Sequence, residues 1–375
     1  MAVDDLKREL IEYMEKAHRK RYHRGYFGCL TALLVESEPV TQKRIMELTK
    51  YSRASVSLAL QKLQLTLPVR TLKIMGDRKQ YYTYQGGPEQ FLVDILERRT
   101  DMPDIDLEMI GTIQKKAEIK EKEHPSYCRL LNYLEELRLY LELMHSIRKD
   151  SLRKFRTILR SGSFEDLDFP DSSDLNSSEI TGFLHRVMTS EGLSETEHEP
   201  IKDKPPLHYM ELKREYFRGI KTGLNPLYAQ SIADLLVVVH DVIIEKATTQ
   251  DEIQEATQLP RSTISQVLSL AVDEETIEIE KLPGSRTRIY RPAISLMELF
   301  LNYYDRAFAY ASTIRRKVED LADRVQNSNS ETSESMEFLQ TLCVLERAYA
   351  STQEFTIRAK TRFVKELMRK LEGRI

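Results

Sequence analysis

Basic and hydroxyl-bearing side chains concentrate in two short stretches near the start of this 375-residue chain. The first, SRAS at residues 52–55, sets an arginine among serines where a helix is expected to begin, and the second, GDRK at residues 76–79, sets two cations in an expected turn. Guanidinium and ammonium groups bind phosphate, and an arginine can also bond both acceptors on the edge of guanine. These residues therefore point to recognition of a polyanion.

Charge is divided unevenly along the chain, although its net charge is only −3. Residues 18–84 hold 13 Lys and Arg against 4 Asp and Glu, a balance of +9, whereas residues 226–292 hold 6 against 11, a balance of −5. Solvated surfaces usually mix both signs, so the first block predicts a polyanionic partner.

The sequence repeats itself after 208 residues. Eight of twenty positions are identical between TQKRIMELTKYSRASVSLAL (41–60) and TQDEIQEATQLPRSTISQVL (249–268). The same shift superposes a glycine, an arginine and a tyrosine of the expected turns: Gly76, Arg78 and Tyr82 fall on Gly284, Arg286 and Tyr290. One offset kept across separate blocks indicates two copies of one fold.

Each copy has the pattern of three helices followed by a two-stranded hairpin. In the first copy, helices are expected over 26–35, after the N-cap residue Thr41, and over 53–63, with β-prone runs at 69–74 and 79–84. Long helical patterns with regularly spaced leucines follow both copies. The expected fold class is mainly α with small β-wings, arranged as two winged helix-turn-helix domains with long flanking helices.

Composition divides the chain into three parts. Residues 161–206 are rich in Ser, Asp, Glu and Pro and hold too few apolar residues to form a core, so they predict a flexible acidic linker. The expected organisation is a first module over 1–160, the linker over 161–206 and a second module over 207–375. No run of about 20 apolar residues occurs, which predicts a cytoplasmic chain with no membrane partner.

The first copy resembles the MarR superfamily of transcriptional regulators, especially its GbsR-like branch. The resemblance rests on the helical N-terminus, on TQKRIMELTKYSRASVSLALQKL and on the basic wing GDRKQYYTY, and it covers about residues 20–100. Two departures are the segment LQLTLPVR, which lacks an aromatic-glycine step, and the presence of two modules where the family has one. The resemblance implies that the helix starting near Arg53 enters the major groove of double-stranded DNA, while Arg78 and Lys79 approach the backbone or minor groove.

Groove geometry sorts the remaining candidates of the first module. Residues on the exposed N-terminal part of a recognition helix meet base edges, and cations around it hold phosphates. The expected base-facing set is Ser52, Arg53, Ser55, Ser57 and Gln61, and the expected phosphate set is Lys43, Arg44, Lys50, Lys62, Arg70 and Lys73. The second module keeps a weaker set, surrounded by carboxylates: Arg261, Ser262, Thr263, Ser265, Arg286 and Arg288. We expect both modules to touch DNA, with the first dominant.

Enzymatic interpretations find no support in the motifs. The three cysteines form no CxxC pair, the eight histidines form no HExxH, and no phosphate-binding glycine loop occurs, so we expect no catalytic residue, metal or cofactor. A small-molecule effector of unknown identity stays open. So do an intramolecular pseudo-dimer and a homodimer.

A second hypothesis is a tandem winged-helix scaffold that binds proteins, as a chromosome-associated or complex-assembly subunit without sequence-specific DNA readout. The acidic second module and linker motivate it.

Overall fold

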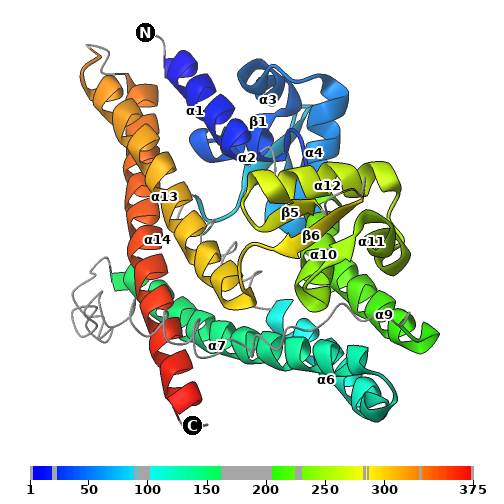
Figure 1. Cartoon of the computed structure of the whole chain (residues 1–375). Helices are drawn as coiled ribbons and strands as arrows, with labels where there is room; N and C mark the ends of the chain where they lie inside the picture. Colours follow the sequence, from blue (N-terminus) through cyan, green and yellow to red (C-terminus); the bar gives the residue numbers. More distant parts are fainter. Residues whose placement is uncertain are drawn as a thin grey trace. The chain divides into compact units, whose positions relative to one another are not determined.

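The computed structural model describes residues 3–18, 23–87, 90, 102–161, 205–223, 230–281, 284, 287–328 and 332–372. The described part is mainly helical, with two small antiparallel sheets (Figure 1). The expected linker, residues 161–206, lies almost entirely outside it. None of the described helices is long and apolar enough to cross a membrane.

The described residues form two compact units. The first unit contains α1 (Val3–His18), α2 (Tyr26–Val35), β1 (Val40–Thr41), α3 (Gln42–Thr49), α4 (Arg53–Thr66), β2 (Val69–Lys73) and β3 (Gln80–Tyr84). It also contains residues 306–326 of α13 (Leu296–Gln326) and residues 333–356 of α14 (Ser333–Glu372).

The second unit contains α6 (Met102–Glu118), the short 3-10 helix η1 (Glu121–Glu123), α7 (Pro125–Ser161), α9 (Leu207–Gly223), α10 (Gln230–Glu245), β4 (Thr248–Thr249), α11 (Gln250–Thr257), α12 (Arg261–Asp273), β5 (Ile277–Lys281) and β6 (Arg288–Pro292). Residues 296–305 of α13 and 357–372 of α14 complete it.

The same elements recur 208 residues apart, as the sequence repeat predicts. Strands β4, β5 and β6 begin and end 208 residues after β1, β2 and β3, and α11 does so after α3. The strand orders β1-β3-β2 and β4-β6-β5 match, and so does the register, because Val40 pairs with Tyr82 and Thr248 with Tyr290. The sequence pattern predicts only two strands per copy. Strands β1 and β4 were not predicted, because a two-residue strand has no period to detect.

Buried apolar side chains explain why these helices form and pack. In the first unit every residue of α2 is buried, and α3 and α4 add Ile45, Leu48, Val56, Leu60 and Leu63 to the same core. Thr41 caps α3 by accepting a hydrogen bond from the amide of Arg44, and Ser52 caps α4 in the same way. Helix α4 continues to Thr66, three residues beyond the expected end.

Each unit takes its long helices from the other half of the chain. In the first unit, α1 contacts α13, where the hydroxyl of Tyr13 donates to the carbonyl of Thr313 and Tyr310 bonds the ring of the buried His18. In the second unit, α9 contacts α6 and α7, through Lys116 to Glu215 and Tyr127 to His208. The helices that follow one repeat therefore pack on the first helix of the other.

Candidate nucleic-acid interface

The turn between α3 and α4 is held in a fixed conformation. Lys50 ends α3 with a left-handed backbone (φ 58°), and Tyr51 packs so closely over Gly28 of α2 that a Cβ there would lie 2.9 Å from its ring. Gln42 spans the turn, because its side-chain amide donates to the carbonyl oxygen of Arg53 at 3.0 Å. The backbone at the start of α4 is thus fixed, while the Arg53 side chain is exposed.

Arg53 has no ion pair or side-chain hydrogen bond to the rest of the described chain. Its neighbours Ser52 and Ser55 are exposed but bonded to each other, since the Ser52 hydroxyl accepts from the Ser55 amide at 3.2 Å and lies 2.9 Å from the Ser55 hydroxyl. Further along α4, Gln61 is exposed, whereas Ser57 and Lys62 are half-buried. Arg53 and Gln61 are therefore the members of the expected base-facing set that are exposed and form no side-chain hydrogen bond within the described residues.

Asp77 organises the turn between β2 and β3. Its carboxylate accepts hydrogen bonds from the Lys79 amide at 2.9 Å and from the Tyr81 hydroxyl at 2.8 Å, and these bonds lower its pKa. Gly76 takes φ +86° beside it, a conformation that other residues rarely adopt. The turn is thereby fixed and presents its cations outward.

The hairpin carries four exposed cations: Arg70, Lys73, Arg78 and Lys79. Lys79 lies 3.9 Å from Asp77 and is 69% exposed. The other three form no ion pair within the described residues. Together with Arg53 and Lys43, which is 85% exposed and 3.7 Å from Glu47, they make up what we call the basic face.

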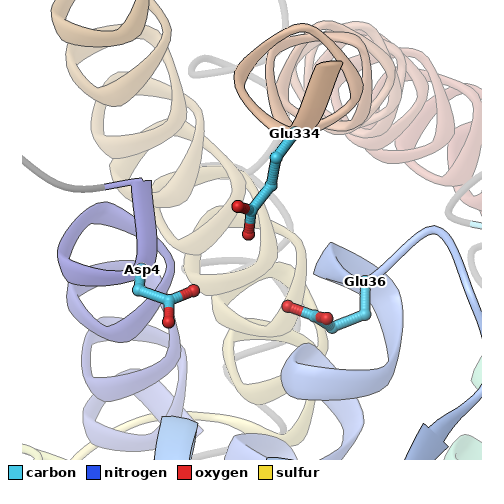
Figure 2. A group of neighbouring side chains, drawn as sticks. All are labelled: Asp4, Glu36 and Glu334. Atoms are coloured by element: carbon cyan, nitrogen blue, oxygen red, sulfur yellow. The ribbon is translucent and has the colours of Figure 1, made fainter. Parts of the chain in front are cut away.

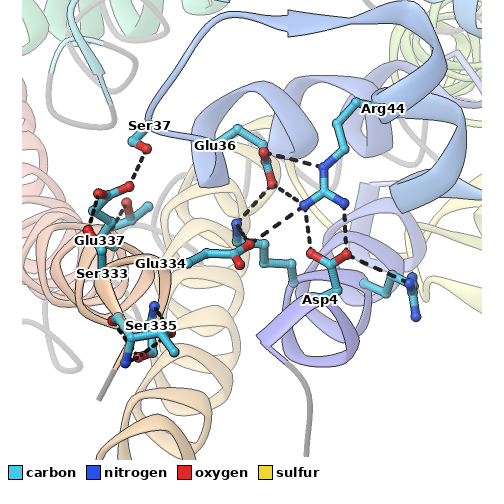
Figure 3. Close-up of polar contacts among 12 residues, drawn as sticks. Asp4, Glu36, Ser37, Arg44, Ser333, Glu334, Ser335 and Glu337 are labelled. Atoms are coloured by element: carbon cyan, nitrogen blue, oxygen red, sulfur yellow. Dashed lines mark hydrogen bonds and ion pairs between the residues drawn. The ribbon is translucent and has the colours of Figure 1, made fainter. Parts of the chain in front are cut away.

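Arg44 departs from the expected phosphate set. Its guanidinium bonds both oxygens of Asp4 at 2.6 and 2.7 Å and reaches Glu36 at 2.9 Å (Figure 3). These hydrogen bonds raise the pKa of Arg44 and lower that of Asp4. Arg44 thus ties α3 to α1 and to the end of α2, and we leave it out of the basic face.

Three carboxylates converge beside Arg44, from Asp4, Glu36 and Glu334 (Figure 2). One oxygen of each lies within 4.8 Å of the others, a spacing that could suit a cation. Protein cations already occupy the space, because Lys7 Nζ bonds Glu36 and Glu334 at 2.9 Å each and Arg44 bonds Asp4 and Glu36. The cluster is therefore a network of ion pairs within the first unit.

The second repeat pairs two of its arginines with carboxylates of its own. Arg261, which follows Arg53 by 208 residues, forms an ion pair with Asp251 at 2.6 Å, and Asp251 stands at the position of Lys43. Glu280 of β5 holds Arg291 of β6 at 2.6 Å, so a second cation is neutralised.

The remaining candidates of the second repeat differ in exposure. Ser262, Ser265 and Arg288 are exposed and Thr263 is half-buried, while Arg286 lies outside the described residues. Gln250 donates to the Arg261 carbonyl at 3.2 Å, as Gln42 does to Arg53, so the two turns share a backbone design but differ in charge.

Asp251 stands at the position of Lys43 and pairs with Arg261. A sum of charges over each segment does not show this pairing. The signal was present in the sequence, because the 208-residue shift aligns these two positions directly.

No family model matches the chain, and none of the curated proteins is significantly similar to it in sequence. The resemblance to MarR regulators therefore stays a prediction from the residues of the repeats.

Proposed function

We propose that the chain is a double-stranded DNA-binding transcriptional regulator of MarR/GbsR type. In this proposal each repeat is a winged helix-turn-helix, with α4 as the recognition helix and the β2–β3 hairpin as the wing. The single observation that carries it is the basic face of the first unit, where Arg53 and three hairpin cations are exposed and free of ion pairs within the described residues.

Each part of the basic face has a distinct role in the proposal. A helix fits the major groove, and Arg53 in the first turn of α4 reaches base edges there, with the Gln42 bond fixing its backbone. The hairpin cations and Lys43 bind phosphates and supply affinity without sequence choice. Arg261 binds DNA weakly, because Asp251 already neutralises it.

The exchange of long helices between repeats supports an intramolecular pseudo-dimer. Each unit joins a three-helix core from one half of the chain to long helices from the other. One chain would then supply two unequal DNA-binding modules, and the first would make most of the sequence-specific contacts.

The experiment is fluorescence anisotropy with labelled duplexes selected from a random-sequence pool, first at low salt. We expect wild-type protein to bind with a steep salt dependence and the Arg53→Ala/Arg78→Ala double variant to bind at least tenfold more weakly. Arg316→Ala, at an exposed arginine of α13 outside the repeats, is the matched control and should bind as wild type does. If the wild type fails to bind at low salt, or the double variant binds equally well, the proposal is wrong.

The protein-binding scaffold stays a second candidate because α4 exposes two leucines, Leu58 at 56% and Leu65 at 84%. Recovery of one stoichiometric protein partner, lost on Leu58→Ser/Leu65→Ser and combined with absent DNA affinity, would favour the scaffold.

A further inference from the structure

The hairpin tip exposes three apolar side chains in four consecutive positions. Leu72 is 41% exposed, Ile74 51% and Met75 100%. Water-exposed apolar side chains clustered at one point commonly mark a contact surface. The tip therefore has the composition of a contact site, although it belongs to no core.

The turn holds Met75 in a fixed outward position. The Asp77 amide donates to the Ile74 carbonyl at 3.0 Å, Gly76 supplies the positive φ, and the Asp77 carboxylate is bonded from both sides as described above. The side chain with the greatest exposure thus sits at the end of a structured projection.

Charge indicates which partner the tip fits. Ile74 and Met75 lie between the cations Lys73 and Arg78, and Arg70 and Lys79 extend the positive charge on the two sides. An apolar protein surface would be matched poorly by four cations, whereas a DNA groove offers phosphates on both walls and apolar base faces between them. Proteins of several folds insert apolar wedges between base steps of the minor groove and kink the duplex.

We propose that Met75 is such a wedge, entering the minor groove, opening one base step and bending the DNA toward the major groove. The inference deepens the DNA-binding function proposed above and rests on it. Methionine suits this role because its flexible thioether adapts to a narrow space. The second repeat keeps only two of these four cations, Lys281 and Arg286, because Glu278 and Thr287 stand at the positions of Arg70 and Lys79.

The experiment uses the full chain and a selected duplex of about 30 base pairs, long enough for two half-sites one helical turn apart. Donor and acceptor dyes at the two ends report bending, and 2-aminopurine placed at successive steps reports unstacking. We expect saturating wild-type protein to shorten the end-to-end distance and raise 2-aminopurine fluorescence at one step.

Met75→Ala should abolish both signals, while its affinity falls by no more than about tenfold because the saved unstacking cost offsets part of the lost contact. Arg78→Ala should weaken binding but keep both signals at saturation. Met336→Ala, which removes an exposed methionine side chain from α14, is the matched control and should behave as wild type.

The wedge is overturned if wild-type protein binds the duplex without bending or unstacking it, or if Met75→Ala keeps both signals. Absence of duplex binding by the wild type is a different result, because it removes the proposed function itself and the wedge with it.

Discussion

The two repeats share a backbone plan but use charge in opposite ways. In the first, Arg53 of α4 and four cations of the hairpin are exposed, and Arg53 has no acidic partner within the described chain. In the second, Asp251 pairs with Arg261 and Glu280 with Arg291, and the buried Lys213 pairs with Asp241 at 2.5 Å and with Glu245 at 2.7 Å. The two copies of one backbone plan therefore differ in which of their arginines are paired with carboxylates.

The largest expected effect is on stability, and it differs between the ion pairs of Lys213 in the second unit and those of Lys7 in the first. Lys213→Met leaves the buried Asp241 and Glu245 without their main counter-charge, and we expect a loss of about 3–5 kcal/mol in stability. Lys7→Met should cost about 1–2 kcal/mol, because Arg44 still pairs Glu36 and because Glu334 is 53% exposed. Hydrogen exchange of α9 and α1 measures each unit separately, and equal losses would contradict the comparison.

The next largest effect concerns the two equivalent arginines at the starts of α4 and α12. Arg53→Ala should cost about 1–3 kcal/mol of discrimination at one base pair, whereas Arg261→Ala should change affinity less than twofold since its charge is already neutralised. Competition anisotropy with single-base variants of the selected duplex measures both. A larger effect from Arg261→Ala would reverse the assignment of the dominant repeat.

A reciprocal exchange of charge sharpens the same contrast. Lys43→Asp should give Arg53 an acidic partner like that of Arg261, and the slope of log affinity against log salt should become less steep by about one unit. Asp251→Lys should remove the acidic partner of Arg261, and the same slope should become steeper by a similar amount. Titrations at several salt concentrations supply the slopes. Opposite or absent changes would show that the two positions do not face phosphate.

The smallest effect concerns how α1 is joined to α13. Hydrogen bonds from Arg324 and Lys317 lower the pKa of Glu9 to about 2 from an ordinary 4.5, so its contribution is complete above pH 4.5 and is lost as the pH falls toward 2. Because Glu9 is 36% exposed, solvent screens the pair and Glu9→Gln should cost about 0.5–1 kcal/mol at pH 7.

Urea unfolding of wild type and Glu9→Gln at pH 7 and pH 2.5 measures this difference, which should shrink at the lower pH. The position equivalent to Glu9 in the second repeat is the buried Phe217 of α9, which carries no carboxylate. The control is therefore Glu215→Gln, also on α9, which removes the exposed ion pair with Lys116 and should change stability less. A difference that persists unchanged at pH 2.5 would contradict the role of the Glu9 carboxylate.

Local features of the site could be predicted from the sequence. The N-cap residue Thr41, the strands of the hairpin and the turn at Gly76 follow from short-range preferences, and α4 is only three residues longer than expected. The sequence analysis placed Ser52 in the base-facing set, whereas its hydroxyl caps α4. The exposed apolar tip was not expected, because hydropathy alone does not show whether Met75 faces a core or water.

The duplication, the helical class and the surplus of cations in the first copy could be read from the amino-acid sequence, since each depends on residue type and on spacing along the chain. Which cations are exposed and unpaired depends on how the helices pack. Arg44 and Arg53 lie nine residues apart, yet one is held by Asp4 and Glu36 and the other is free, and packing that brings α1 against α3 makes that difference. The exchange of long helices between halves was likewise decided by packing, because an apolar stripe records that a helix needs a partner but not which helix it will be.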